Sequence, residues 1–221
     1  ILVNGSGQTA VQETRFNTFT NDTIVPCTAG CAENYFDIVL TSNATDITFT
    51  NVSFNKSRIS IMPRDLVFPR ENNNLTVRWY LNVNVTNSTN QAGIAGAQVN
   101  INDSFANNIG NFTTDSGGGI ATQIVTEFTM INGTNSSKYF NVNTDTCSGI
   151  NNVNVTCFTP YNMSVNKTGY NPGKASVDVN RSKFVNISLG IIVIDIIFPV
   201  VNTSFNVTNA NALVNDVINF T

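Results

Sequence analysis

The chain has 221 residues, of which only 11% are charged, and its formal net charge is −3. Soluble domains carry about 25% charged residues, and nucleic-acid-binding domains show a basic patch or stripe that is absent here, so we exclude nucleic-acid binding. The complete lack of histidine excludes Ser-His-Asp and Cys-His catalysis, histidine-ligated zinc or haem, and a histidine pH switch.

Asparagine takes the place of the missing charges, with 37 residues beside 27 threonines and 16 serines. Helix-forming residues are scarce, whereas Val, Ile, Thr and Phe, which favour strands, are common. Asparagine and glycine supply turns. The composition therefore predicts an all-β fold.

Residues 1–70 are expected to form short strands, including 36–40 and 46–50, between asparagine-rich turns. The segment 17–23 is similar to the segment 51–57, which lies 34 residues later. Such repeats are typical of a right-handed parallel β-helix, which usually needs three or more of them. Two interpretations stay open: the last coils of a β-solenoid, or extra strands laid against the next domain.

A connector is expected at 62–70, which holds two prolines and three charged residues, and we place a domain boundary there. The second domain, 71–190, begins with a period-two pattern that predicts a half-buried strand. Its apolar positions are Val77, Trp79, Leu81, Val83 and Val85.

Three glycine-rich motifs follow this strand. They are Gly93-Ile-Ala-Gly96-Ala97-Gln-Val99, then Thr114-Asp115-Ser-Gly117-Gly118-Gly119, and then Val165-Asn-Lys167-Thr-Gly169-Tyr170. In this order they resemble the transthyretin-like, carboxypeptidase-regulatory-like β-sandwich, over residues 75–190. An insertion at 132–159, which carries Cys147 and Cys157, departs from the pattern of that family.

The resemblance implies a transthyretin- or immunoglobulin-like β-sandwich without catalytic residues, like the spacer and stalk domains of bacterial and archaeal surface proteins. An asparagine-rich β segment followed by such a sandwich is also similar to archaeal surface glycoproteins.

Residues 191–221 are expected to form a C-terminal extension, either an inter-subunit strand or the start of a further domain. The run 191–201 is the most apolar of the chain, but its 11 residues are too few to span a bilayer. We interpret it as a strand buried on both faces, in which Asp195 needs a hydrogen-bonded or cationic partner. One or two more strands are expected in 202–221.

Asn-x-Ser/Thr motifs, the acceptors of N-glycans in secreted proteins, are strongly enriched. The counts of Asn, Ser and Thr would produce about seven motifs by chance, and the sequence holds 20. An AT-rich genome would explain many asparagines but not their phase with Ser and Thr. We therefore predict that sugars form the solubilising layer.

The motif at Asn219 lies too near the end of the sequence to be a good acceptor. Crowding is expected between Asn84 and Asn87 and between Asn132 and Asn135. The predicted acceptors are Asn4, Asn21, Asn43, Asn51, Asn55, Asn74, Asn84, Asn87, Asn102, Asn111, Asn132, Asn135, Asn154, Asn162, Asn166, Asn180, Asn186, Asn202 and Asn206.

Four cysteines in such a chain indicate disulfides formed in an oxidising compartment. The simplest of three connectivities pairs Cys27 with Cys31 and Cys147 with Cys157. A zinc site made of all four is the alternative, although the spacings fit it poorly. The sequence begins with Ile1 rather than methionine. This is expected if a signal peptide has been removed or if the sequence starts in the middle of a longer protein.

The 14 carboxylates are spread without a cluster, and no motif selects a catalytic pair. We expect no catalytic residue, no metal site and no cofactor. Asp115 is expected to be a turn residue rather than a calcium ligand. Trp79 is expected in the core rather than on a sugar-stacking platform.

These features together predict a secreted, extracellular structural protein of the cell surface, not an enzyme. It would carry N-glycans and self-associate into a filament or an S-layer, with no membrane span in this chain. Residues 1–4 and 191–201 are candidate strands for pairing between subunits.

Two alternatives stay open. A glycan-binding adhesin or stalk module would expose aromatic residues, for which Tyr139, Phe140 and Tyr161 are candidates. The tail of a β-helix enzyme that processes polysaccharides would need many more coils upstream.

Overall fold

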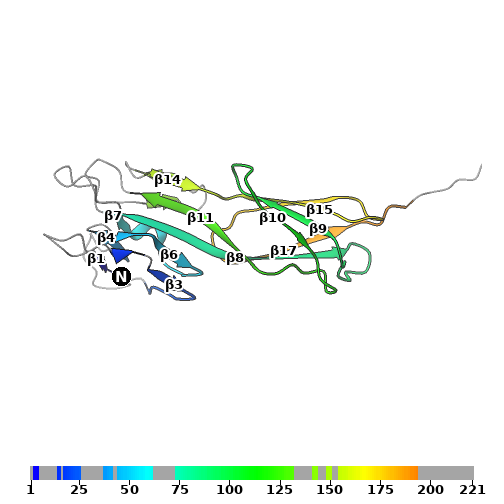
Figure 1. Cartoon of the computed structure of the whole chain (residues 1–221), viewed down its shortest axis with the longest axis horizontal. Coiled ribbons are helices and arrows are strands. Elements are labelled where there is room, and N and C mark those ends of the chain that lie inside the picture. The colour runs from blue at the N-terminus through cyan, green and yellow to red at the C-terminus, as the bar shows by residue number, and fades with distance from the viewer. Residues whose placement is uncertain are drawn as a thin grey trace, which may run out of the picture.

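The computed structural model describes residues 2–4, 14–15, 17–25, 37–41, 44–61, 73–131, 141–143, 148–150 and 154–193. These residues form β-strands joined by turns, and the one helical element among them is the 3₁₀ turn η1 (Lys56–Arg58). The prediction of an all-β fold is confirmed. Figure 1 shows an elongated molecule with the N-terminal strands in one half and a β-sandwich in the other.

Parallel strands stack in the N-terminal half. β1, β4 and β7 pair in parallel, as do β2 with β5, and β3 with β6 and then β8. Strands that return in the same order and pair in parallel with the previous winding are the arrangement expected of a β-solenoid, and we call this half the solenoid. The strands are β1 (Leu2–Asn4), β2 (Thr14–Arg15), β3 (Thr18–Thr20), β4 (Ile38–Thr41), β5 (Ala44–Thr45), β6 (Ile47–Thr50) and β7 (Ile59–Ile61).

The repeat between the first two windings differs from the one expected. Phe19 lies opposite Phe49, with their ring centroids 5.1 Å apart. Asn21 and Asn51, 30 residues apart, occupy equivalent turns, and Asn51 Nδ2 donates a hydrogen bond of 2.9 Å to Asn21 Oδ1. Both have positive φ, 55° and 53°, which asparagine tolerates better than most residues.

The alignment at 34 residues was therefore wrong. It matched Asn21 with Asn55 through their glycosylation motifs. Such a motif describes the chemistry of an acceptor, whereas strand register follows from which side chains are buried.

β8 (Asn74–Asn87) is the longest strand and belongs to both halves. Its first residues pair with β6, whereas residues 81–87 pair in parallel with β17 (Lys183–Leu189). β11 (Gln123–Ile131) runs antiparallel along its other side and pairs in turn with β14 (Asn154–Cys157). The predicted alternation is confirmed, because Val77, Trp79, Leu81, Val83 and Val85 are all buried.

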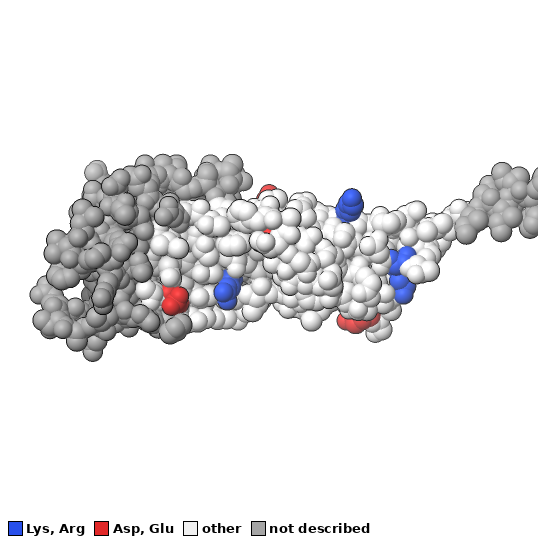
Figure 2. Space-filling model, turned by 45° about the horizontal axis from the view of Figure 1, so that its top comes forward, with Lys and Arg blue, Asp and Glu red and all other residues white. Residues whose placement is uncertain are grey.

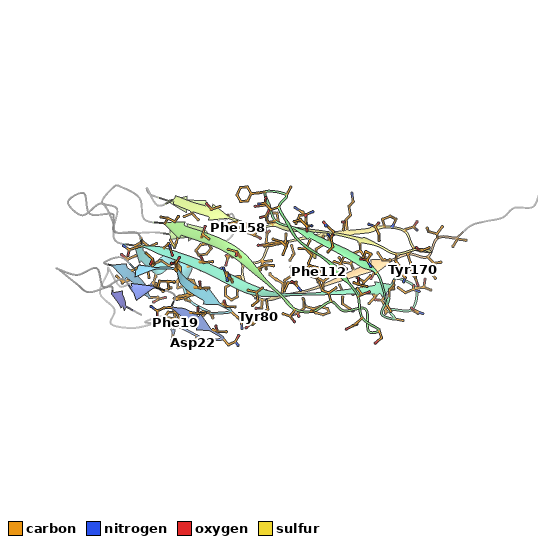
Figure 3. All side chains as sticks on the ribbon, viewed as in Figure 1. Phe19, Asp22, Tyr80, Phe112, Phe158 and Tyr170 are labelled. Carbon is orange, nitrogen blue, oxygen red and sulfur yellow. The ribbon has the colours of Figure 1, made fainter. Side chains whose placement is uncertain are left out.

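A four-stranded antiparallel sheet forms the other layer of the sandwich. Its order is β10 (Asn108–Thr113), β9 (Gln98–Asn102), β15 (Tyr161–Asn166) and β16 (Gly173–Val177). Val99, Ile101 and Val165 from this sheet share one core with Val83 and Leu189 of the facing layer. The sandwich prediction is confirmed. Figure 3 labels Phe112 in the sandwich and Phe19 in the N-terminal half.

The glycine-rich motifs meet at the end of the sandwich. Thr114 Oγ1 donates to Ile94 O at 2.6 Å and accepts from Ala97 N at 2.8 Å. A Cβ on Gly93 would lie only 2.0 Å from Gly117 O. These contacts explain the motif residues physically, while membership of the transthyretin-like family and an archaeal origin stay predictions.

The insertion contributes a hairpin of β12 (Asn141–Asn143) and β13 (Ser148–Ile150). Residues 62–72, which include the whole of the expected connector, lie outside the described residues. The proposed boundary at residue 70 thus stays a proposal, although β8 pairs with strands on both sides of it.

The described start of the apolar run does not form a strand buried on both faces. Ile191, Ile192 and Val193 are 49%, 45% and 83% exposed, and Ile191 makes only an isolated bridge to Tyr170. The prediction was wrong for these residues, because hydrophobicity alone does not say whether a covering sheet exists in the same chain. Asp195 and residues 202–221 lie outside the described residues.

We predict that Phe49→Ala destabilises the protein by about 3–5 kcal/mol, because it removes a fully buried ring. Phe49 packs edge-on against both Phe19 and Phe54. The matched control is Phe184→Ala, which truncates a ring that is 69% exposed and should change stability by less than about 0.5 kcal/mol. Denaturant unfolding measures both, and equal effects would contradict the described core.

Candidate functional site

The outer face of the four-stranded sheet is covered by asparagine and other neutral polar side chains. We call it the asparagine face; its residues are Gln98, Asn100, Asn102, Asn108, Asn111, Thr113, Asn162, Ser164 and Asn166. The register sets them in cross-strand rows, with Asn100 between Asn111 and Ser164, and Asn102 between Asn108 and Asn162. Because alternate residues of a strand share a face, the sequence Gln-Val-Asn-Ile-Asn of β9 turns every amide outward.

Hydrogen bonds link neighbouring amides on this face. Asn100 Nδ2 donates to Asn111 Oδ1 at 2.7 Å, and Asn102 Nδ2 donates to Asn100 Oδ1 at 2.8 Å. Asn108 Nδ2 donates to Asn102 Oδ1 at 3.1 Å. The side-chain nitrogen is the atom to which an N-glycan is attached. Asn111 takes part in these bonds through its Oδ1, so its Nδ2, the atom that would carry a glycan, is not used in them.

Four predicted acceptors lie on the asparagine face. Asn111, Asn162 and Asn166 are exposed, and Asn102 is half-buried. This clustering makes the outer layer of the sandwich the best candidate for a glycan-bearing surface.

A second pair of predicted acceptors lies on the opposite layer. Asn84 of β8 and Asn186 of β17 stand directly opposite each other in the parallel register, and Asn84 Nδ2 donates to Asn186 Oδ1 at 3.4 Å. Asn186 is exposed, whereas Asn84 is half-buried. Two glycans on this pair would compete for the same space, which is a crowding that the sequence alone did not show.

Other predicted acceptors differ in accessibility. Asn21 is exposed, and Asn51, Asn55, Asn74 and Asn180 are half-buried. Asn87 is only 8% exposed, and its Oδ1 accepts a bond of 2.9 Å from Thr89 N, which opposes glycosylation in the folded protein. The side chains of Asn4, Asn43, Asn132, Asn135, Asn154, Asn202 and Asn206 lie outside the described residues.

A buried polar cluster lies where the solenoid meets the sandwich; we call Lys56, Trp79, Glu127 and Asn180 the junction cluster. Lys56 Nζ lies 2.5 and 2.7 Å from the two carboxylate oxygens of Glu127 and donates to Asn180 O at 2.8 Å. Trp79 Nε1 donates to Glu127 Oε2 at 2.5 Å. The Lys56 ammonium also lies 5.3 Å from the centre of the Trp79 ring.

A β-bulge aims Glu127 into the interior. The register between β11 and β8 shifts between Thr126 and Phe128, so that Glu127 and Phe128 are both buried although they are neighbours in sequence. Bulges redirect side chains in this way. Burial lowers the pKa of Lys56, and the charge of Glu127 and its hydrogen bond oppose that shift.

Sequence reasoning did not find the junction cluster. A usable signal was a glutamate inside an apolar strand, in a chain with so few charges. A buried carboxylate needs a cationic partner, but only the fold identifies Lys56, 71 residues away.

Three individual predictions have clear outcomes. Asp115 is a turn residue as expected, since its Oδ1 accepts from Gly117 N and Gly119 N at 2.8 and 3.0 Å. Trp79 is in the core as expected. The prediction of Tyr161 as an exposed aromatic residue was wrong, because its side chain faces inward with Met163 and Val165. Its hydroxyl donates to Thr126 O at 2.7 Å, and burial raises its pKa to about 12.

Tyr139 and Phe140 lie outside the described residues, as do Cys27, Cys31 and Cys147. Cys157 is disulfide-bonded, and the predicted pairings stay predictions. Within the described part of the chain, no three Cys, Asp or Glu side chains gather as a metal site. There, too, no helix has the length and apolar character to cross a membrane.

No family model and no curated protein matches this chain. Among solved structures, an (S)-allantoin synthase is 9% identical, with a TM-score of 0.29, over 51% of this chain and 40% of that one. The shaft pilin SpaA of Lactobacillus rhamnosus GG is 10% identical, with a TM-score of 0.28, over 55% and 53%. The major pilin subunit BcpA of Bacillus cereus is 14% identical, with a TM-score of 0.23, over 52% and 28%.

The chain thus spans about half or less of the length of these proteins. With TM-scores below 0.5, the similarities carry no argument about function, which must come from the residues themselves.

We predict that glycopeptide mass spectrometry of the native protein finds sugars on Asn111 and Asn162 and none on Asn87. The first two side chains are exposed on the asparagine face, whereas Asn87 is buried in a turn. Asn111→Gln should remove one glycan mass, and Asn87→Gln should leave the glycan mass unchanged. A glycan on Asn87 with none on the asparagine face would contradict this assignment.

Proposed function

We propose that this chain is a heavily N-glycosylated, non-catalytic structural subunit of an extracellular filament or surface layer, joined to its neighbours by β-strand pairing. The observation that carries this proposal is the exposed apolar segment after β17. Ile191, Ile192 and Val193 present large apolar side chains to solvent and open the most apolar run of the sequence. An apolar segment without cover in its own chain suits a partner surface.

The partner that fits is an open strand edge of another copy. β3 pairs with β6 only, at the end of its sheet, within the described part of the chain. Its sequence Thr-Phe-Thr has no charge or proline, the usual protections of an edge. A solenoid also needs a cap on its terminal winding.

The geometry favours a head-to-tail arrangement. Residues 191–193 leave the sandwich in the half of the molecule opposite to β3 (Figure 1). A C-terminal strand of one subunit added beside β3 of the next would cover the apolar segment of the first subunit and the β3 edge of the second. The β3 edge of the first subunit and the apolar segment of the second would stay free for further growth. Such a contact is heterologous and therefore generates a polymer.

The surface suits a glycan coat. Figure 2 shows only a few charged side chains on the visible face of the described residues. Glycans on Asn111, Asn162 and Asn166 would add a solubilising layer over the neutral amides of the asparagine face. Those positions lie on the flat sheet surface and leave the strand edge of β3 uncovered.

Several described carboxylates serve the fold, which supports a non-catalytic role. Asp103 Oδ1 accepts from Phe105 N and Asn107 N, both at 2.9 Å. Asp115 closes its turn, and Glu127 is buried. A shallow hollow of about 410 Å³ holds Lys167 and Tyr170 but no carboxylate, so it lacks the acid–base pair that a glycosidase needs.

We predict that Val193→Asp prevents polymer formation while leaving the fold of the monomer intact. A charge at this position, 83% exposed in the monomer, would be buried without a partner in a subunit contact. The control is Phe105→Asp, which places the same charge on a loop side chain that is 57% exposed. Electron microscopy of the native glycoprotein and of both variants measures the outcome.

Ordered filaments or sheets in the wild type and in the control, and dispersed monomers for Val193→Asp, are the expected result. Dispersed wild-type monomers would contradict the proposal. Normal assembly after deletion of 202–221, or of residues 1–4, would remove those segments as donor strands.

A further inference from the structure

The junction cluster brings the Lys56 amine to the backbone of Asn180. Lys56 Nζ lies 2.8 Å from the main-chain oxygen of Asn180, and the Asn180 carboxamide branches from the same residue. The Oδ1 atom of this carboxamide is buried and has no hydrogen-bond partner. Buried polar atoms in proteins are nearly always bonded, so an orphaned amide oxygen in the residue whose main-chain carbonyl binds Lys56 needs an explanation.

Glu127 supplies the group that such a pair would need for proton transfer. Both of its carboxylate oxygens contact Lys56 Nζ, and Trp79 Nε1 fixes one of them. The Lys56 and Glu127 side chains are only 7% and 2% exposed. In this dry environment the charged amine is disfavoured, and burial lowers the pKa of Lys56 toward the nucleophilic neutral form.

We propose that Lys56 and Asn180 join through an intramolecular isopeptide bond, with Glu127 as the proton-transfer residue. The Glu127 carboxylate takes one proton from the Lys56 ammonium, which frees the lone pair on Nζ to attack Cγ of Asn180. A second proton passes from Nζ through the carboxyl group to the amide nitrogen of Asn180. The bond from Cγ to that nitrogen breaks, ammonia leaves, and Glu127 stays protonated. No oxidant or cofactor is required.

The bond would link distant parts of the chain. Lys56 and Asn180 are 124 residues apart: Lys56 follows the second solenoid winding, and Asn180 precedes the last sandwich strand, β17. A pull between the solenoid and the segment after β17 would then run through a covalent bond and the single strand β17. The covalent path between these two parts would bypass residues 57–179, which include strands β7 to β16. The inference concerns the covalent structure of the monomer and stands or falls separately from polymer formation.

The same inference excludes one predicted glycan. Asn180-Arg-Ser182 is a glycosylation motif, but an isopeptide bond and an N-glycan use the same side-chain amide. Asn180 is therefore a cross-linking residue, and its glycosylation motif carries no glycan.

Peptide mapping of the native protein by mass spectrometry decides the proposal. The expected result is a branched peptide that contains Lys56 and Asn180 and weighs one ammonia less than the two separate peptides. Lys56→Arg, which keeps a cation beside Glu127 but cannot form this bond, should yield unbranched peptides. Lys167→Arg, at a lysine whose Nζ lies 3.4 Å from Gly96 O, should still yield the branched peptide.

Separate, unmodified Lys56 and Asn180 peptides from the wild type would overturn the proposal, as would a glycan on Asn180. Glu127→Gln tests the role of the carboxylate, because glutamine has a similar shape but cannot accept the proton. Circular dichroism checks that this variant is folded. A branched peptide from folded Glu127→Gln in the wild-type amount would overturn the role of Glu127.

Discussion

The buried contact between Lys56 and Glu127 is the constraint on which the two halves of this molecule depend. While the chain folds, taking these two charges out of water is costly, and removing one partner of a buried pair typically costs about 3–5 kcal/mol. The pair is therefore stable only if three parts of the chain meet at one point. The turn η1 must present Lys56, a bulge in β11 must present Glu127, and the segment before β17 must bring the Asn180 carbonyl to the same point.

β8 transmits this constraint along the molecule. It pairs with solenoid strand β6 at one end and with sandwich strand β17 at the other, and Trp79 in its middle contacts the Lys56–Glu127 pair. The solenoid and the sandwich thus share a strand, a core and the junction cluster. A rod built in this way suits a subunit that bears load, whereas its neutral amide surface suits a coat of sugars.

Local pattern predicted the parts of the fold that depend on local chemistry. The alternation of β8 and the turn at Asp115 could be read from the sequence, because strand period and turn chemistry act over a few residues. Exposed acceptors such as Asn111 and Asn162 follow from the same alternation. The clustering of these acceptors on one sheet does not, because it requires the pairing of β9 with β10 and β15.

The remaining features depend on long-range geometry. The 30-residue repeat was missed because two equivalent asparagines, Asn21 and Asn51, share a turn conformation that a motif search does not see. Tyr161 was placed on the surface because aromatic composition carries no information about which face of β15 is covered. Glu127 and Lys56 could not be joined without the fold, since 71 residues separate them.

Native-state hydrogen exchange tests most directly whether one buried contact unites the solenoid and the sandwich. We expect the most protected amides of β6 and of β9 to exchange with one common free energy, because both open only on global unfolding. Glu127→Gln should lower that free energy for both strands by the same amount. Independent opening of β6 in the wild type, or a loss confined to one half in the variant, would contradict the claim.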